Sequence, residues 1–367
     1  MLSTNIFARF LRYKGVIELC LCKAFILVLS LTVVRFNREW MIDVPMVLKG
    51  CDFLLTFKCV AKCRHCSYRG SPERSGVMSV DDFRRYMTVL AGEQSLDWIT
   101  FHGGEPFLFY KTLVRCIEIA HKLGQKETAV ITNGYWGGSQ ANAQTKLREL
   151  KKAGLTSVFF SVDAFHQEHV PFRSVHTAIN VARAVDFEKI TVSSCYLGSV
   201  DSDNSFNRKT EECLERLKLP DDFQIDKHSL DVQGRATDTL TPNLKHKPGI
   251  PQGKCVLPYW AGETLKDPKV IEIDYMGNVS ICPGLCIGNA KNESLSKILR
   301  DYDYRKHPII KLLAEHGPCK LIDLLESKTQ IQPGKYVNEC HLCYELRNQL
   351  RASYLELLAP ENCFEEQ

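Results

Sequence analysis

The stretch TFKCVAKCRHCSYRG, residues 56–70, contains three closely spaced cysteines in the pattern C-x3-C-x2-C: Cys59, Cys63 and Cys66. A structural tetrahedral metal site uses four protein ligands, and this motif offers three. Three thiolates can instead hold three irons of a [4Fe–4S] cluster, so that the fourth iron stays open to a chelating small molecule. The motif therefore predicts an iron–sulfur site whose missing ligand is part of its function.

The cysteine content of the whole chain supports metal binding. Sixteen of the 367 residues are cysteines, and they group at metal-ligand spacing, whereas disulfide scaffolds of this density are usually short secreted domains. We therefore expect a reducing, cytoplasmic environment. The 47 basic and 43 acidic side chains are evenly balanced, which argues against a nucleic-acid partner.

From about residue 50, short β-rich runs alternate with amphipathic helical segments, a pattern typical of βα units and a parallel sheet. The expected strands are residues 52–57, 97–101, 128–132, 157–162, 189–197 and 223–232. Ser79 is an expected helix N-cap, and Gly154 is an expected helix end. The fold class predicted is α/β, a partial (βα)6 TIM-like barrel.

Several polar motifs follow these strands directly. In parallel sheets and barrels the chemistry lies at the carboxyl ends of the strands, so we expect these motifs to meet there. They are the cysteine motif, the HGGEP segment with Gly103, Gly104, Glu105 and Pro106, the NG segment with Asn133, and the SVDAFH segment with Ser161 and Asp163. His166 and His169 form an H-x-x-H in the same region, which we interpret as loop histidines rather than metal ligands.

The cysteine motif and the GGEP segment together resemble the radical S-adenosylmethionine (SAM) superfamily. The resemblance implies that SAM chelates the open iron, that Gly103 to Pro106 line its amino group, and that Glu105 accepts a hydrogen bond there. It also implies that Asn133, Ser161 and Asp163 hold the ribose hydroxyls and carboxylate of SAM. His65 stands where this family usually has an aromatic residue, and its ring can still pack over the cluster or the adenine.

A second cysteine-bearing region begins after about residue 240. Residues 269–284 read as a β-hairpin that turns at Met276 to Asn278, and the C-x2-C pair opens a helix. The four candidate ligands are Cys255, Cys282, Cys340 and Cys343, with Cys286 as a substitute. The region resembles the SPASM/twitch domains of radical SAM enzymes, which implies a second, auxiliary [4Fe–4S] cluster. A structural zinc site is the alternative.

The sequence divides into four expected parts: an extension over 1–45, a radical SAM core over 46–245, a twitch-like α+β domain over 246–347, and a helix and tail over 348–367. Residues 16–35 are apolar enough to suggest membrane association. An alternative is that translation starts at Met41 or Met46, so that the extension is not part of the protein. The remaining cysteines are expected to be buried apolar side chains.

The resemblance implies an enzyme that takes an electron from a ferredoxin- or flavodoxin-type donor and cleaves SAM to a 5′-deoxyadenosyl radical. That radical abstracts hydrogen from a substrate, which C-terminal domains of this type suggest is a peptide or protein side chain. One alternative is an enzyme acting on a small molecule, similar to the cyclase of molybdenum cofactor synthesis. Another is a non-catalytic iron–sulfur protein.

Overall fold

The computed structural model describes residues 46–255, 263–329 and 331–366. These residues belong to one compact unit, Pro45–Gln367. The predicted N-terminal extension, with Cys20, Cys22 and the candidate membrane segment, lies outside the described residues. Within the described part of the chain, no helix is long and apolar enough to cross a bilayer.

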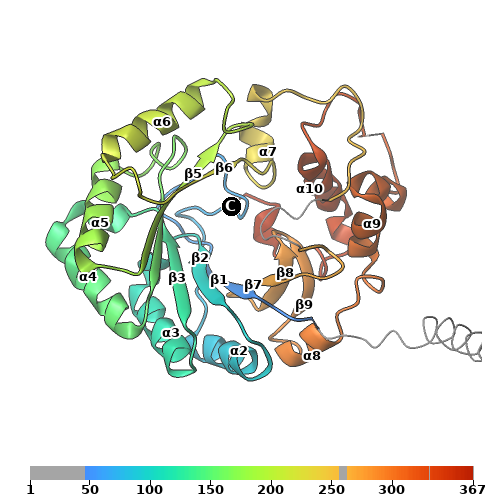
Figure 1. Cartoon of the computed structure of the whole chain (residues 1–367). Helices are drawn as coiled ribbons and strands as arrows, with labels where there is room; N and C mark the ends of the chain where they lie inside the picture. The colour runs from blue at the N-terminus through green and yellow to red at the C-terminus, as the bar shows by residue number, and fades with distance from the viewer. Residues whose placement is uncertain (1–45, 256–262, 330, 367) are drawn as a thin grey trace, which may run out of the picture. The chain divides into compact units, whose positions relative to one another are not determined.

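The described strands form a single curved sheet with the order β6-β5-β4-β3-β2-β1-β7-β8-β9 (Figure 1). The strands are β1 (Gly50–Thr56), β2 (Trp98–Gly103), β3 (Glu127–Thr132), β4 (Ser157–Ser161), β5 (Lys189–Tyr196), β6 (Ile225–Ser229), β7 (Val270–Asp274), β8 (Asn278–Cys282) and β9 (Leu285–Asn289). β1 to β6 pair in parallel and in chain order. The predicted six-stranded parallel core is confirmed.

Helices connect the parallel strands and cover the outer face of the sheet (Figure 1). They are α2 (Val80–Glu93), α3 (Tyr110–Lys122), α4 (Gln140–Ala153), α5 (Phe172–Val185) and α6 (Ser205–Leu217). The Ser79 hydroxyl caps α2 by accepting a hydrogen bond from the Asp82 amide at 3.0 Å. Gly154 ends α4 in the left-handed conformation at φ 113°. Both predicted helix limits are therefore confirmed.

The predicted hairpin is formed by β7 and β8, which pair in antiparallel fashion. β7 also pairs in parallel with β1, so the hairpin continues the barrel sheet on the side opposite β2. The sheet thus runs across residue 245, where a boundary between two domains is predicted. The cysteine motif after β1 and the hairpin cysteine Cys282 consequently belong to neighbouring parts of one sheet.

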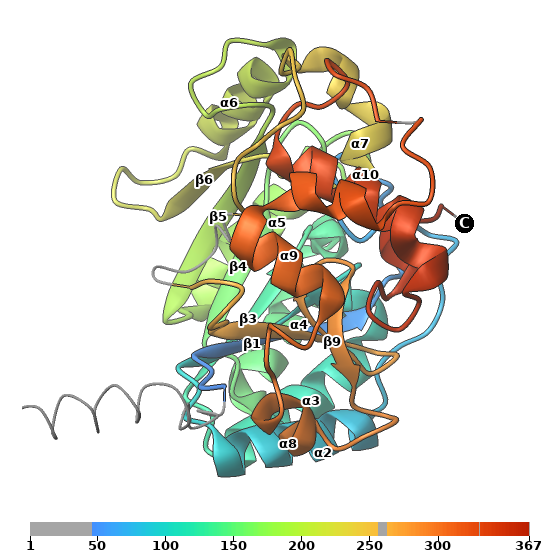
Figure 2. The same ribbon diagram turned by 90° about the vertical axis from the view of Figure 1, so that its right-hand side faces the viewer.

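The chain after β9 is helical and lies on one side of the sheet (Figure 2). It contains α8 (Leu295–Arg300), α9 (Pro308–His316) and α10 (Glu339–Leu350), and the short helix α7 (Ala236–Thr239) precedes β7. The 3-10 helices are η1 (Pro106–Phe109), η2 (Tyr135–Gly138), η3 (Thr241–Asn243), η4 (Pro318–Leu324), η5 (Arg351–Ser353) and η6 (Glu361–Cys363). η4 packs against both α9 and α10. α10 begins at the predicted C-x2-C pair.

The two faces of the sheet differ in chemistry. Alternate residues of β1 and β2, such as Phe53 and Phe101, are fully buried against the helices, where Phe83 of α2 packs edge-on to Phe53. The intervening residue Asp52 pairs in register with Glu272 of β7 on the inner side. Apolar packing therefore holds the helices, and polar groups remain inside the barrel.

Glu272 is an inner carboxyl group that is only partly satisfied by the protein. Its Oε1 accepts a short hydrogen bond from the Tyr68 hydroxyl, while its Oε2 is excluded from solvent and has no hydrogen-bond partner among the described residues. Burial, with a smaller contribution from the charge of Asp52, raises the pKa of Glu272 to about 8. The carboxyl group is therefore mainly protonated at neutral pH.

Glu272→Gln should make the protein less sensitive to alkaline pH. Because the pKa of Glu272 is raised from the ordinary value of 4.5, its contribution to stability is complete below about pH 4.5 and is lost as the pH rises from there through about 8. We expect the melting temperature of the variant to exceed that of the wild type by several degrees at about pH 9, by less at about pH 6, and to approach it only near pH 4. Glu293→Gln at an exposed site is the control. Parallel pH profiles for Glu272→Gln and wild type would contradict this account.

Candidate active site

A cavity of about 280 Å³ lies at the carboxyl ends of the parallel strands. Eight residues predicted from the sequence line it together: Cys59, Cys63, Cys66, Gly103, Gly104, Asn133, Ser161 and Asp163. They come from the last residues of β2 and β4 and from the segments that follow β1, β2, β3 and β4. The expectation that these motifs meet at one edge of the sheet is therefore borne out by their positions.

The cysteine loop is held in place by its own backbone and by one buried arginine. Cys66 Sγ accepts a hydrogen bond from the Gly70 amide at 3.3 Å. Arg235, which is 4% exposed, donates to the carbonyl oxygens of Cys63 at 2.8 Å and of Gly70 at 3.1 Å. Arg235 thus ties the middle of the motif to Gly70, which follows it.

The donor set fits an iron–sulfur cluster chemically. The three cysteines are free thiols. Burial raises the pKa of Cys59 to about 12, and it raises the pKa of Cys63 well above the ordinary value. Such thiols ionise only when a cation takes the place of their protons, which is what binding to iron provides.

The two glycines after β2 are required by close packing against the cysteine loop. Gly103 has φ 119°, and a Cβ on it would lie 2.4 Å from the Thr56 carbonyl oxygen. A Cβ on Gly104 would lie 2.1 Å from the Lys58 carbonyl oxygen, next to Cys59. The Gly104 amide donates to the Thr56 carbonyl oxygen at 2.6 Å. The glycines therefore let the loop after β2 pack directly on the segment that carries the cysteines.

Gly104→Ala should disrupt the site although it adds a single methyl group. The backbone at Lys58 must move to admit the Cβ, and a displacement of about 1 Å in a catalytic site can lower activity about a hundredfold. We expect SAM binding and cleavage to fall by that order. Gly92→Ala in α2 is the matched control, because a Cβ there meets nothing within 4 Å. Equal activity of the two variants would contradict this role for Gly104.

Glu105 and Pro106 do not line the cavity with their neighbours. The Glu105 carboxylate is fully buried and accepts hydrogen bonds from the Thr132 hydroxyl at 2.8 Å and from the amides of Asn133 at 2.9 Å and Phe107 at 3.1 Å. Burial raises the pKa of Glu105 to about 7. The Glu105 oxygens thus bind the chain itself, and the contact of Glu105 with the amino group of SAM stays a prediction. Pro106 is buried at the start of η1.

The Asp163 carboxylate also forms its hydrogen bonds with groups of the chain itself. Its Oδ1 accepts from the amides of Phe165 at 3.0 Å and His166 at 2.9 Å, and its Oδ2 accepts from the Cys195 amide at 3.2 Å. Although burial alone would raise it, the His166 charge and these hydrogen bonds hold the pKa of Asp163 well below its usual range. Asn133 is engaged in a similar way, because its Oδ1 accepts from the Tyr135 amide at 3.0 Å and its Nδ2 donates to Cys59 Sγ at 3.6 Å. Asn133, Ser161 and Asp163 all line the cavity, and their contacts with SAM stay predictions.

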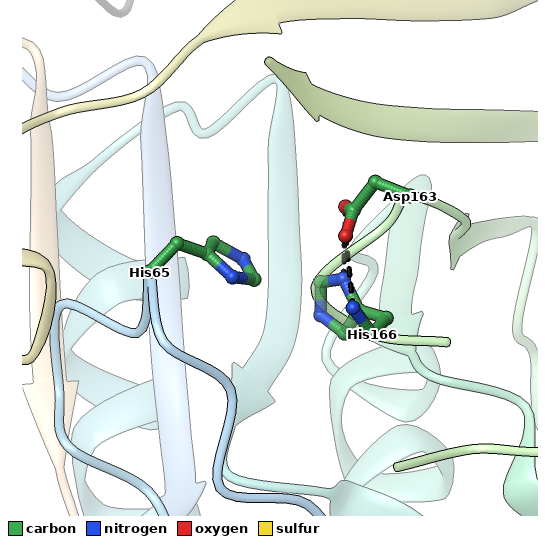
Figure 3. Close-up of side chains that lie close together, drawn as sticks. All are labelled: His65, Asp163 and His166. Carbon is green, nitrogen blue, oxygen red and sulfur yellow. Dashed lines mark hydrogen bonds and ion pairs between the residues drawn. The ribbon is translucent and has the colours of Figure 1, made fainter. Parts of the chain in front are cut away.

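Asp163 fixes the ring of His166, a residue that the sequence placed in a loop without a role. The ring Nδ1 lies 2.9 Å from Asp163 Oδ2, and both residues line the cavity (Figure 3). Despite burial, the Asp163 carboxylate raises the pKa of His166. The position of His166 three residues after Asp163 was the available signal for this pair.

His65 completes a cluster of three ligand-type side chains on this wall (Figure 3). Its ring lies edge-on to that of His166 with centroids 4.7 Å apart, and burial lowers the pKa of His65 to about 3, so the ring is neutral. Donor atoms of His65, Asp163 and His166 all lie within 4.8 Å of one another, close enough to hold a metal ion. His169 is not part of this group.

A second cavity, of about 150 Å³, contains the other predicted cysteines. Cys255, Cys282, Cys340 and Cys343 all line it, although they come from three separate segments of the chain. Burial raises the pKa of Cys255 and of Cys340 to about 12. Four thiols that line one cavity suit a bound metal centre, and iron–sulfur or zinc would satisfy the donor set.

The remaining described cysteines are placed mainly as buried side chains. The thiol of Cys286 donates to the Gly288 carbonyl oxygen at 3.0 Å and does not line the second cavity, so its expected role as a substitute ligand is not supported. Four cysteines lie in the interior as expected: Cys51, Cys116, Cys195 and Cys213. Cys195 also lines the first cavity, with His102 and His228, which the sequence did not single out.

Comparison with known proteins agrees with this geometry. Residues 53–217, from β1 to the end of α6, match the model of the radical SAM superfamily. The chain contains a radical SAM domain. The domain carries the three cysteines of the first cavity and the loops after β1 to β4. The residues that line the second cysteine cavity all lie outside the matched residues.

One curated relative and two solved structures illustrate what this chain is similar to. It is 30% identical over 138 residues to YydG of Bacillus subtilis (strain 168), a protein named for peptide biosynthesis. That match covers 38% of the chain and 43% of the relative, so less than half of YydG is matched. The structure of anSMEcpe with AdoMet and a Cp18Cys peptide has a TM-score of 0.46 and 15% identity, covering 84% of this chain and 97% of that chain.

The second solved structure is Streptococcus suis SuiB bound to the precursor peptide SuiA. It has a TM-score of 0.40 and 10% identity, and the match covers 84% of this chain and 78% of that chain.

Proposed function

We propose that this protein is a radical SAM enzyme that cleaves SAM reductively and uses the product to abstract hydrogen from a peptide or protein side chain. The observation that carries the proposal is the first cavity. Three cysteines at C-x3-C-x2-C spacing, the Gly103–Gly104 backbone and the polar residues Asn133 and Ser161 line one space of about 280 Å³.

The first cavity would hold a [4Fe–4S] cluster through Cys59, Cys63 and Cys66, with SAM beside it. The bound cluster supplies the electron that breaks the carbon–sulfur bond of SAM. The chain itself positions these groups. Arg235 fixes the cysteine loop, and Asn133 and Ser161 line the space beside it.

We extend the proposal to a second [4Fe–4S] cluster at Cys255, Cys282, Cys340 and Cys343. Their common cavity supports one metal centre there, and the resemblance to twitch domains favours iron–sulfur over zinc. Reduction of the first cluster requires a low-potential partner of ferredoxin or flavodoxin type. Free thiols throughout the described residues suit a reducing compartment such as the cytoplasm.

A peptide is the proposed substrate class because the matched relative YydG is named for peptide biosynthesis. A small metabolite remains the alternative substrate. The two are separated by incubating the reduced enzyme with a precursor peptide and following the peptide mass. A mass change that requires both SAM and reductant supports the peptide.

Electron paramagnetic resonance tests the first site directly. After reduction, the signal of the cluster should change when SAM is added, because SAM binds the iron that has no cysteine ligand. An identical spectrum with and without SAM, in protein with its full complement of iron, would contradict the assignment of the first cavity as the SAM-binding cluster site. The measurement does not depend on knowing the substrate.

A further inference from the structure

A buried arginine belongs to the second cavity although no sequence motif marks it. Arg347 lies on α10 seven residues after Cys340 and four after Cys343, so all three occupy one face of the helix. Arg347 is 1% exposed and lines the second cavity with the four cysteines. Its position is therefore set by the same helix that presents two of the thiols.

Arg347 is only partly satisfied by the protein. One guanidinium nitrogen, Nη1, donates to the Pro283 carbonyl oxygen at 2.8 Å, directly after Cys282. The Nε atom is buried and has no hydrogen-bond partner among the described residues. A buried cation costs free energy unless an anion compensates it. Burial lowers the pKa of Arg347, and the nearby sulfurs of Cys343, Cys282 and Cys363, when ionised, raise it.

Of the other charged groups at this cavity, the anion Glu339 does not neutralise Arg347, and the cation Lys254 does not replace it inside the protein. Glu339 lines the cavity but is paired with Lys247 at 2.6 Å, and it accepts from the Gly253 amide. Lys254 is exposed to solvent, where water and salt screen its charge. Among the described residues, Arg347 is thus the buried cation that lines the cavity with the thiols.

We propose that Arg347 is the charge partner of the metal centre at the four cysteines and raises the reduction potential of the cluster bound there. This inference rests on the proposed second cluster. Four thiolates outweigh the positive charge of the iron–sulfur core, and reduction adds one more negative charge to an already anionic site. A fixed cation nearby stabilises the reduced form more than the oxidised form, and in a buried site this effect is weakly screened. Arg347 therefore favours acceptance of an electron at this site.

The test measures the potential of the second cluster alone. The full-length chain carries Cys59→Ala, Cys63→Ala and Cys66→Ala, so that only the second site can hold iron, and the potential is read by titration with electron paramagnetic resonance. Arg347→Gln should lower the reduction potential. Arg347→Lys should stay close to the potential of the parent protein, because the positive charge is kept. Arg351→Gln, one helical turn further along and paired with Glu361 and Glu365 at the surface, should leave it unchanged.

Each outcome decides the inference. Arg347→Gln with full iron and an unchanged potential overturns it while leaving the second cluster intact. If Arg347→Gln loses its iron, Arg347→Lys decides: retained iron supports the charge role, and loss of iron in both variants overturns it. A tightly held zinc and no iron in the background protein overturns the second cluster itself, and this inference with it.

Discussion

Alanine at Cys59, Cys63 or Cys66 should abolish the reductive cleavage of SAM. Each thiolate fixes one iron of the first cluster, and the open fourth iron exists only while the other three are held. The assay is the formation of 5′-deoxyadenosine under anaerobic, reducing conditions. The second site should keep its iron in each variant, because its four cysteines line a different cavity.

Cys116→Ala is the matched control for these variants. Cys116 is a fully buried cysteine of α3 in the main hydrophobic core and lines neither cysteine cavity. Its replacement should cost some stability but leave SAM cleavage in place. A triple variant of the motif that still forms 5′-deoxyadenosine would show that the first site is assigned wrongly.

The double variant Cys340→Ala/Cys343→Ala should separate SAM cleavage from substrate turnover. Anaerobically reconstituted wild type should hold about eight irons per chain and the double variant about four, as expected for two [4Fe–4S] clusters and for one. SAM cleavage should be retained, because the first cavity is lined by other residues. Conversion of the peptide should be lost. Wild type with about four irons and one tightly held zinc would show that the second region is a structural zinc site.

The arrangement of the first site was predictable because it follows from chain order. Parallel strands joined by helices bring their carboxyl ends to one edge, so motifs placed directly after successive strands must converge there. Cys59, Gly104, Asn133 and Ser161 accordingly share one cavity. The pairing of β7 with β1 was not predictable, because the alternation of polar and apolar residues in a strand does not show which strand it pairs with.

The direction of individual carboxylates could not be read from the motifs. Glu105 turns toward Thr132 and the Asn133 amide, which lie on the next strand and only become neighbours in the folded sheet. Asp163 likewise binds the Cys195 amide on β5. Arg347 is the opposite case: its spacing from Cys343 on one helix was visible in the sequence, but its burial depends on how α10 packs.

The most direct test of the central claim is whether the wild-type protein cleaves SAM at all. Protein with its iron and sulfide reconstituted is reduced without oxygen and incubated with SAM, and the products are separated by chromatography. The account predicts 5′-deoxyadenosine and methionine in equal amounts, formed only when reductant is present. Fully iron-loaded, reduced protein that leaves SAM intact would contradict it.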